Sequence, residues 1–456
     1  MRSTCHVPAL LLLSAVTLSS VGTGCRSHEG FRKQYQQQLK PYMVQGQWAQ
    51  AAQVLQASKG KVYKEADRVM YSLNLGTLYH YAGQYDPSMT QFVAAEKSIQ
   101  DLWTTSVSSE ASKFIVSESV QDYPGEDFEK ILVYFYTALN RVKQGNLSDA
   151  LVEARRADEF LKKIQVQYEK EKEQVGTLYK QDAFMLWLVG LFYEIEGSWA
   201  DAFLAYQSAY KAYQTEYAGK FGAASPTFLQ EDLIRTAQLA GRTDAVAEYT
   251  QKFGEVGHSL LAAAEGKAEV ILIHAAGEAP YKAQTFIQGK MPDGYMMRIA
   301  IPKFVPNKHR VRTAELEVAG QTAKTELMEP VARIALDNYK HRLPAITARA
   351  VARAIVKYVA TQATKKAVKG SGKDSKRAAI GALVGLIGNV ASAASENADL
   401  RAWTMLPAEI GVTRMWVPAG EHTVNVRYLG PGARTEQIAI NVKAGERRIL
   451  SVRTLQ

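Results

Sequence analysis

One stretch decides how the N-terminal half of this chain folds. It is Tyr71–Ile99, which reads YSLNLGTLYHYAGQYDPSMTQFVAAEKSI. Large apolar side chains recur on both sides of Gly83 at helical spacing. Gly76 and Ser88 are small enough to let two helices approach closely, and Gly83 can end the first helix in a left-handed conformation. The stretch therefore predicts a helix, a glycine turn and a second helix.

The order of small and large residues in this stretch resembles a tetratricopeptide repeat, a helix–turn–helix unit that needs neighbouring copies to bury its apolar face. Four further turn glycines mark four further copies, namely Gly46, Gly145, Gly197 and Gly241. The intervals between successive turn glycines all exceed the repeat period of about 34 residues, so insertions are expected. An ordinary helical bundle with glycine-ended hairpins is the alternative.

The N-terminus reads as a targeting segment. Arg2 precedes an apolar run, residues 7–21, that is short for a membrane-spanning helix. The run ends at Val21-Gly22-Thr23-Gly24-Cys25, which resembles a bacterial lipobox. This resemblance implies that residues 1–24 are a lipoprotein signal peptide and that Cys25 is acylated, for example with palmitate. The residue after Cys25 is Arg26 and not Asp. The resemblance then implies that the protein is anchored in the outer membrane and faces the periplasm. A plain secretory signal peptide is the alternative.

Composition narrows the function further. The chain has 456 residues, a formal net charge of +10 and only two cysteines, both in the first 25 residues. With Cys25 acylated, no thiolate metal site or disulfide is expected. The histidines lack metal-ligand spacing, and no nucleophile or phosphate-loop motif is present. We therefore expect no catalytic residues, no metal and no cofactor, and an exported chain is not expected to bind nucleic acid.

The C-terminal half changes to the two-residue period of strands. Seven or eight short alternating runs, separated by turns such as Pro418-Ala419-Gly420, predict a β-sandwich. The expected fold is α+β and multidomain: a TPR-like helical solenoid over residues 25–262, then a β-sandwich-like domain over 266–329 and 398–456. A helical hairpin, 330–397, interrupts the sandwich.

The predicted hairpin combines a basic helix with a glycine-rich apolar helix. Ten basic residues and one acid lie between Arg342 and Arg377, and Gly381 and Gly385 form a GxxxG spacing that permits close helix contact. One interpretation is contact with anionic lipid or glycan through Arg349, Arg353, Lys357, Lys365, Lys366 and Lys369. The other is a buried apolar helix beside a solvated basic helix.

Three segments, Tyr71–Tyr85, Ile115–Arg156 and Asp399–Pro418, resemble a poorly characterised family of bacterial TPR envelope lipoproteins. The resemblance implies a role in envelope assembly, without an established activity. The first hypothesis is a lipid-anchored periplasmic adaptor, possessing a groove that binds an envelope protein in a process such as peptidoglycan assembly. Its candidate partner-binding residues are Asn74, Tyr81, Tyr123, Phe128 and Asn140. The alternative is an assembly subunit that forms homo-oligomers or contacts anionic lipid or wall polymer through residues 342–391.

Overall fold

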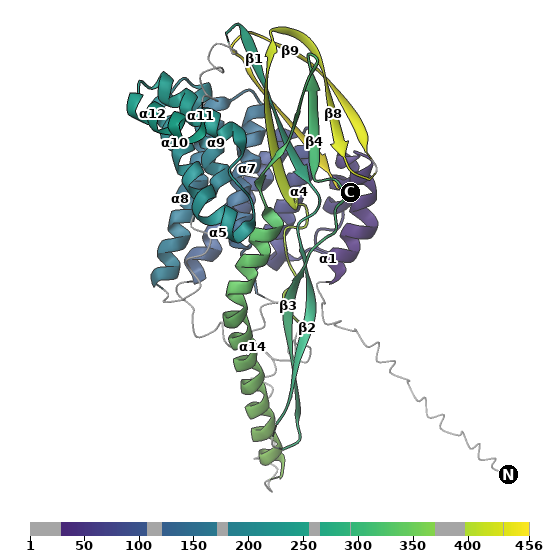
Figure 1. The fold of residues 1–456 in the computed structure, drawn as a ribbon. Helices are drawn as coiled ribbons and strands as arrows, with labels where there is room; N and C mark the ends of the chain where they lie inside the picture. The colour runs from purple at the N-terminus through teal and green to yellow at the C-terminus, as the bar shows by residue number, and fades with distance from the viewer. Residues whose placement is uncertain are drawn as a thin grey trace, which may run out of the picture.

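The computed structural model describes residues 29–106, 121–170, 181–254, 265–291, 293–369, 397–431 and 433–455 (Figure 1). Helices occupy the N-terminal half and strands most of the C-terminal half, so the α+β class is confirmed. The predicted signal peptide, Cys25 and the glycine-rich stretch of the predicted hairpin lie outside the described residues.

The described helices of the N-terminal half pair across glycine turns. Each of the five turn glycines has a positive φ, between 67° and 77°, which is the left-handed conformation that was expected. The pairs are α2 (Lys40–Val44) with α3 (Trp48–Gln56), α4 (Arg68–Tyr81) with α5 (Tyr85–Ser106), α7 (Asp127–Lys143) with α8 (Leu147–Lys170), α9 (Ala183–Ile195) with α10 (Trp199–Ala212), and α11 (Thr227–Leu239) with α12 (Thr243–Phe253). Shorter segments precede or join them: α1 (Glu29–Gln34), η1 (Tyr35–Leu39), η2 (Glu65–Asp67) and η4 (Tyr213–Phe221).

Two glycines inside helices allow the paired helices to pack closely. A Cβ atom at Gly76 would lie 3.0 Å from the Phe92 ring, and one at Gly190 would lie 2.5 Å from the Tyr206 ring. The Ser88 hydroxyl donates to the Gly76 carbonyl oxygen over 2.7 Å. Close contact between α4 and α5 therefore depends on the small residues that the sequence singled out.

The described strands form two four-stranded sheets and a separate two-stranded ribbon. The first sheet has the order β10-β1-β7-β6, and the second has the order β5-β4-β8-β9. β1 runs parallel to β10 and antiparallel to β7. The strand bounds are β1 (Lys267–Ala276), β2 (Tyr281–Lys290), β3 (Met296–Val305), β4 (Thr313–Val318), β5 (Gln321–Lys324), β6 (Glu326–Glu329), β7 (Glu409–Pro418), β8 (Gly420–Leu429), β9 (Arg434–Val442) and β10 (Arg447–Thr454).

The first sheet is buried on both faces, and the alternation along β1 shows how. Ile271 and Ile273 belong to the same apolar core as the helices, whereas Val270 and Leu272 belong to a second core shared with the second sheet. Successive side chains of a strand point to opposite faces, so one sheet serves both cores. The result is three layers, in which the helices, the first sheet and the second sheet lie in that order.

The ribbon β2–β3 and the helix α14 (Val331–Lys369) extend together from the body, as Figure 1 shows. Ile299 and Ile301 of β3 pack against Ala350 and Ala354 of α14. We call the outer part of this projection, residues 284–303 and 343–369, the arm. The helix expected near residues 331–368 is therefore present, and one of its faces is covered by the ribbon.

Candidate functional site

The face formed by α4 and α7, where the groove was expected, is occupied by the chain itself. Residues 397–408 precede β7 and pass over these helices, which Trp403 and Thr404 contact. Ala279 N donates to the Leu406 carbonyl oxygen over 2.9 Å, and Ala408 N donates to the Ala276 carbonyl oxygen over 2.9 Å. We call residues 397–408 the filling segment.

Trp403 anchors the filling segment. Its side chain is 1% exposed and lies among Phe92 and Tyr136, with ring centroids 5.8 and 5.5 Å away. The indole Nε1 donates to Thr77 Oγ1 over 2.9 Å, and the backbone N of Trp403 donates to Glu129 Oε1 over 2.7 Å. A buried indole whose N–H has a partner is a strong packing anchor.

Arg401 is the second anchor. Its buried guanidinium donates to Asp399 through Nε and Nη2, over 2.9 and 2.8 Å, and to the Ala66 carbonyl oxygen over 3.1 Å. Nη1 also lies 3.3 Å from an oxygen of Asp67. The carboxylates of Asp399 and Asp67 therefore compensate for the burial of the Arg401 charge. The contacts with Ala66 and Asp67 also attach the filling segment to η2.

Most of the predicted partner-binding residues are committed to contacts within the chain. Asn74, Tyr123, Phe128 and Asn140 are buried. Asn74 Oδ1 accepts from Thr404 Oγ1 of the filling segment over 3.2 Å, and Tyr123 OH donates to Glu129 Oε2 over 2.6 Å. The expected open groove is therefore corrected to a filled one, because the chain supplies its own extended occupant.

The remaining predicted groove residues belong to a small polar network in the same core. Asn140 Nδ2 donates to Ser88 Oγ over 2.9 Å, and Asn140 Oδ1 lies 2.7 Å from His80 Nδ1. Burial lowers the pKa of His80 to about 4, so its imidazole is neutral at physiological pH. Tyr81 is partly buried, and its hydroxyl lies 3.3 Å from that of Tyr136. These polar groups hold α4, α5 and α7 together.

A buried ion cluster joins the helices to the first sheet. Glu194 of α9 and Asp232 of α11 lie with Glu269 of β1 among three arginines: Arg235, Arg414 and Arg447. Although burial opposes ionisation, the arginines hold the pKa of Glu194 well below its usual range. The six charges balance, which is the arrangement that makes buried ion pairs tolerable.

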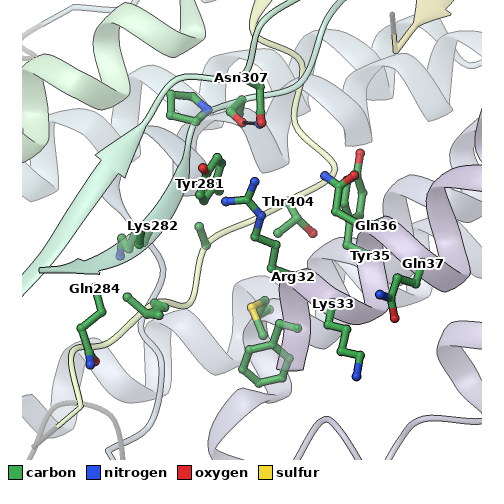
Figure 2. Close-up of a pocket in the computed structure, with 17 residues that line it drawn as sticks. Arg32, Lys33, Tyr35, Gln36, Gln37, Tyr281, Lys282, Gln284, Asn307 and Thr404 are labelled. Atoms are coloured by element: carbon green, nitrogen blue, oxygen red, sulfur yellow. Dashed lines mark hydrogen bonds between the residues drawn. The ribbon is translucent and has the colours of Figure 1, made fainter. Parts of the chain in front are cut away.

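An open cleft of about 510 Å³ lies between the N-terminal helices, the start of the ribbon and the filling segment (Figure 2). Its volume is in the range of small-ligand or peptide side-chain sites. The floor is apolar, with Phe31, Met70, Ala279 and Leu400, and the rim carries amides from Gln36, Gln37 and Gln284.

The cleft is cationic. Three of its lining residues are basic, namely Arg32, Lys33 and Lys282, and none is acidic. Figure 2 shows Arg32 reaching toward Tyr281, and its guanidinium carbon lies 3.0 Å from the centre of that ring. Burial opposes the charge of Lys282, but its contact with Glu126 holds the pKa above the ordinary value. The Arg32 and Lys33 side chains are exposed.

The acids nearest the cleft are engaged in contacts within the chain, two of them with bases and one with hydrogen-bond donors. Burial opposes ionisation of Glu126, but Lys282 and Arg342 hold its pKa below the ordinary value. Glu278 contacts both Lys40 and the Tyr35 hydroxyl. Burial raises the pKa of Glu129 to about 6, and this group accepts hydrogen bonds from the filling segment and Tyr123. These carboxylates stabilise the fold around the cleft.

The predicted anionic-contact residues are only partly placed. Arg349 is partly exposed on α14, whereas Arg353 is buried on the side of the helix that carries Ala350 and Ala354, which pack on the ribbon. Arg353 is therefore corrected from a surface residue to a packed one. The side chains of Lys357, Lys365, Lys366 and Lys369, and residues 370–391, lie outside what the structure describes.

Within the described ranges, no group of three or more His, Cys, Asp or Glu residues is arranged to hold a metal ion. No helix in the same ranges is both long and apolar enough to cross a membrane.

Comparisons with known proteins do not assign the chain to a family. No family model matches it, and no curated protein matches it. The solved structures that are similar include the apo form of RapI, at 13% identity over 52% of this chain and 70% of that one, with a TM-score of 0.31. Another is a kinesin-light-chain protein of Podosopora anserina with nearly identical TPR-like repeats, at 12% identity over 52% of this chain and 98% of that one, also with a TM-score of 0.31. Similarity this low carries no argument about function.

Proposed function

We propose that the protein is a lipid-anchored scaffold of the bacterial cell envelope that binds a protein partner without catalysing a reaction. The anchor is the acylated Cys25, and the location is the outer membrane, facing the periplasm. The binding site is the cationic cleft, in place of the groove over α4 and α7. This role fits the resemblance to TPR envelope lipoproteins in the sequence.

The observation that carries the proposal is the cleft itself. It combines an apolar floor with basic side chains at its rim, and the exposed Arg32 and Lys33 have no acid beside them in the lining. An acidic segment of a partner, with one apolar side chain for the floor, matches both features. Glu126 and Glu278 are engaged in internal ion pairs and Glu129 accepts hydrogen bonds from Trp403 and Tyr123, which favours a binding role over acid–base catalysis.

The internal contacts around the cleft favour a role as a scaffold. The ion cluster and the filling segment fix the helices on the first sheet, so the walls of the cleft are held before a partner arrives. A preformed site loses less conformational entropy when it binds.

The test is photo-crosslinking in cells of the native bacterium. A benzoylphenylalanine residue replaces Gln37 at the cleft, and the control carries it at Gln251, an exposed position on α12. We expect one dominant envelope protein to be crosslinked through position 37 only, and Lys33→Glu to remove that product. The same product at both positions, or its persistence in Lys33→Glu, would contradict the proposed site.

Anchoring is tested separately by labelling cells with palmitate. We expect label in the wild-type chain and none in Cys25→Ser, which should also leave the membrane fraction. Label that persists in Cys25→Ser would refute acylation at this cysteine without affecting the proposed cleft.

A further inference from the structure

The exposed apolar surface of this protein is concentrated on the arm. Among the described residues, thirteen large apolar side chains are exposed, and seven of them lie on the arm. They are Phe286, Ile287, Tyr295, Met296, Ile355, Val356 and Val359. Monomeric proteins rarely group exposed apolar side chains in this way unless the group contacts something.

Some of these side chains lie where the turn of the ribbon meets α14. The rings of Tyr295, in the turn of the ribbon, and Tyr358, on α14, lie 5.4 Å apart, so the ribbon turn and the helix are neighbours there. Met296 is 58% exposed, and Val359, close to Tyr358, is 57% exposed. Ribbon and helix together form one apolar end.

The helix α14 has a second apolar face along the arm. Ala350 and Ala354 face the ribbon, whereas Ala348, Ile355 and Val359 recur at spacings of seven and four residues and are exposed. Residues at such spacings share one side of a helix. This face is apolar although the ribbon does not cover it.

The arm also carries most of the net positive charge of the chain. Residues 284–303 and 343–369 contain nine lysines and arginines and one acid, Asp293, which gives a formal charge of +8 out of +10 for the whole sequence. On the ribbon, Lys290, Arg298 and Lys303 are exposed. The Arg298 guanidinium carbon lies 3.5 Å from the centre of the Phe286 ring, so cation and apolar surface are interleaved.

We infer that the arm binds the surface of an anionic lipid bilayer. Its exposed apolar side chains enter the boundary between headgroups and acyl chains, and its exposed basic side chains, Lys290, Arg298 and Lys303, bind the headgroup phosphates. This combination is the one that amphipathic membrane-surface elements use.

The same observations disfavour the other occupants. Two copies of the arm would bring two charges of +8 together, which opposes self-association at this surface. A nucleic acid would satisfy the charges but leave Ile355 and Val359 exposed to a polar backbone. An anionic bilayer satisfies both the positive charge and the exposed apolar side chains of the arm.

The start of the ribbon contacts the first described helix. Tyr281, the first residue of β2, lies three positions before the arm and contacts Arg32 of α1, which begins at Glu29. Three residues separate Cys25 from Glu29, so the two lie at most about 14 Å apart along the chain. An acyl group on Cys25 would hold the start of the ribbon close to the bilayer. The inference itself stands on the arm residues and does not depend on acylation.

The experiment uses the full chain, with Cys5 and Cys25 replaced by serine and one new cysteine labelled with an environment-sensitive dye. Met296→Cys and Val359→Cys report on the arm, and Val152→Cys is the control, because Val152 is an exposed apolar residue on α8. The vesicles contain phosphatidylcholine and phosphatidylglycerol at 3:1, or phosphatidylcholine alone. Residues 7–21 are apolar enough to adsorb to vesicles by themselves, so the readout is the position of the dye.

We expect a blue shift of the dye at positions 296 and 359 with phosphatidylglycerol vesicles, weakened by salt, and none at position 152. In the labelled chain, Lys290→Gln and Lys303→Gln should each weaken vesicle affinity about fivefold. The control Lys163→Gln, on the exposed side of α8, should leave affinity unchanged. An unshifted dye at positions 296 and 359 would overturn the inference and point to an acidic protein as the occupant. An equal shift at 152, or one that grows with protein concentration without vesicles, would overturn it as well.

Discussion

Replacing Trp403 with alanine should destabilise the whole body of the protein, because this side chain joins the filling segment to α4 and α7. Truncating a fully buried aromatic residue costs about 3–5 kcal/mol in free energy of unfolding. The Thr77 hydroxyl also loses its indole donor, which adds about 1 kcal/mol. The expected loss of about 4–6 kcal/mol is a large part of the total stability of about 5–15 kcal/mol that is usual for a protein.

The assay is equilibrium unfolding in guanidinium chloride, followed by circular dichroism and by intrinsic fluorescence. The matched control is Trp199→Ala, because Trp199 lies at the exposed start of α10 and is only partly buried. We expect the control to lose less than half as much stability as Trp403→Ala. If Trp403→Ala unfolds at the wild-type midpoint, the filling segment does not hold the body together and the reasoning fails.

Three further predictions concern the contacts between elements. Gly190→Ala should lose about 1–3 kcal/mol in denaturant unfolding, because its new Cβ meets the Tyr206 ring, whereas Gly219→Ala, with nothing within 4 Å, should lose almost nothing. Equal losses in the two variants would contradict this. Arg414→Met should lose about 3–5 kcal/mol in the same assay, since the buried carboxylates of the ion cluster lose a counter-charge; a neutral effect would show that the cluster is dispensable. His80, with its pKa lowered by burial to about 4, contributes stability that is present above pH 6.5 and lost as the pH falls toward 4. Between pH 7 and pH 5 the wild type should therefore lose about 2 kcal/mol more than His80→Asn does, and identical losses would refute the assignment.

Much of the helical half could be predicted from sequence because its cues are local. A turn glycine such as Gly83 and a small residue such as Gly76 report on a single helix pair, and each lies where it was expected. The strand β2 was missed because its sequence, YKAQTFIQGK, has little apolar alternation. It pairs with β3 alone and is largely exposed, so no core face marks it.

The predicted binding residues could not be placed because their partners lie far along the chain. Asn74 has the polarity expected of a groove residue, but it contacts Thr404, which is 330 positions away. The one available cue was the stretch from Arg401 to Met405, in which large side chains alternate with small ones just before a strand. Alternation alone cannot distinguish a short strand from an extended segment packed on helices.

Hydrogen exchange of the filling segment tests most directly whether the chain itself permanently fills the face over α4 and α7. The backbone amide of Trp403 donates to Glu129 and that of Ala408 donates to Ala276, so both should be protected. In the purified chain we expect peptides covering residues 402–408 to exchange as slowly as those of α7 and β1. Exchange of these peptides as fast as that of exposed loops would mean that the groove opens, and would return α4 and α7 to consideration as the partner-binding surface.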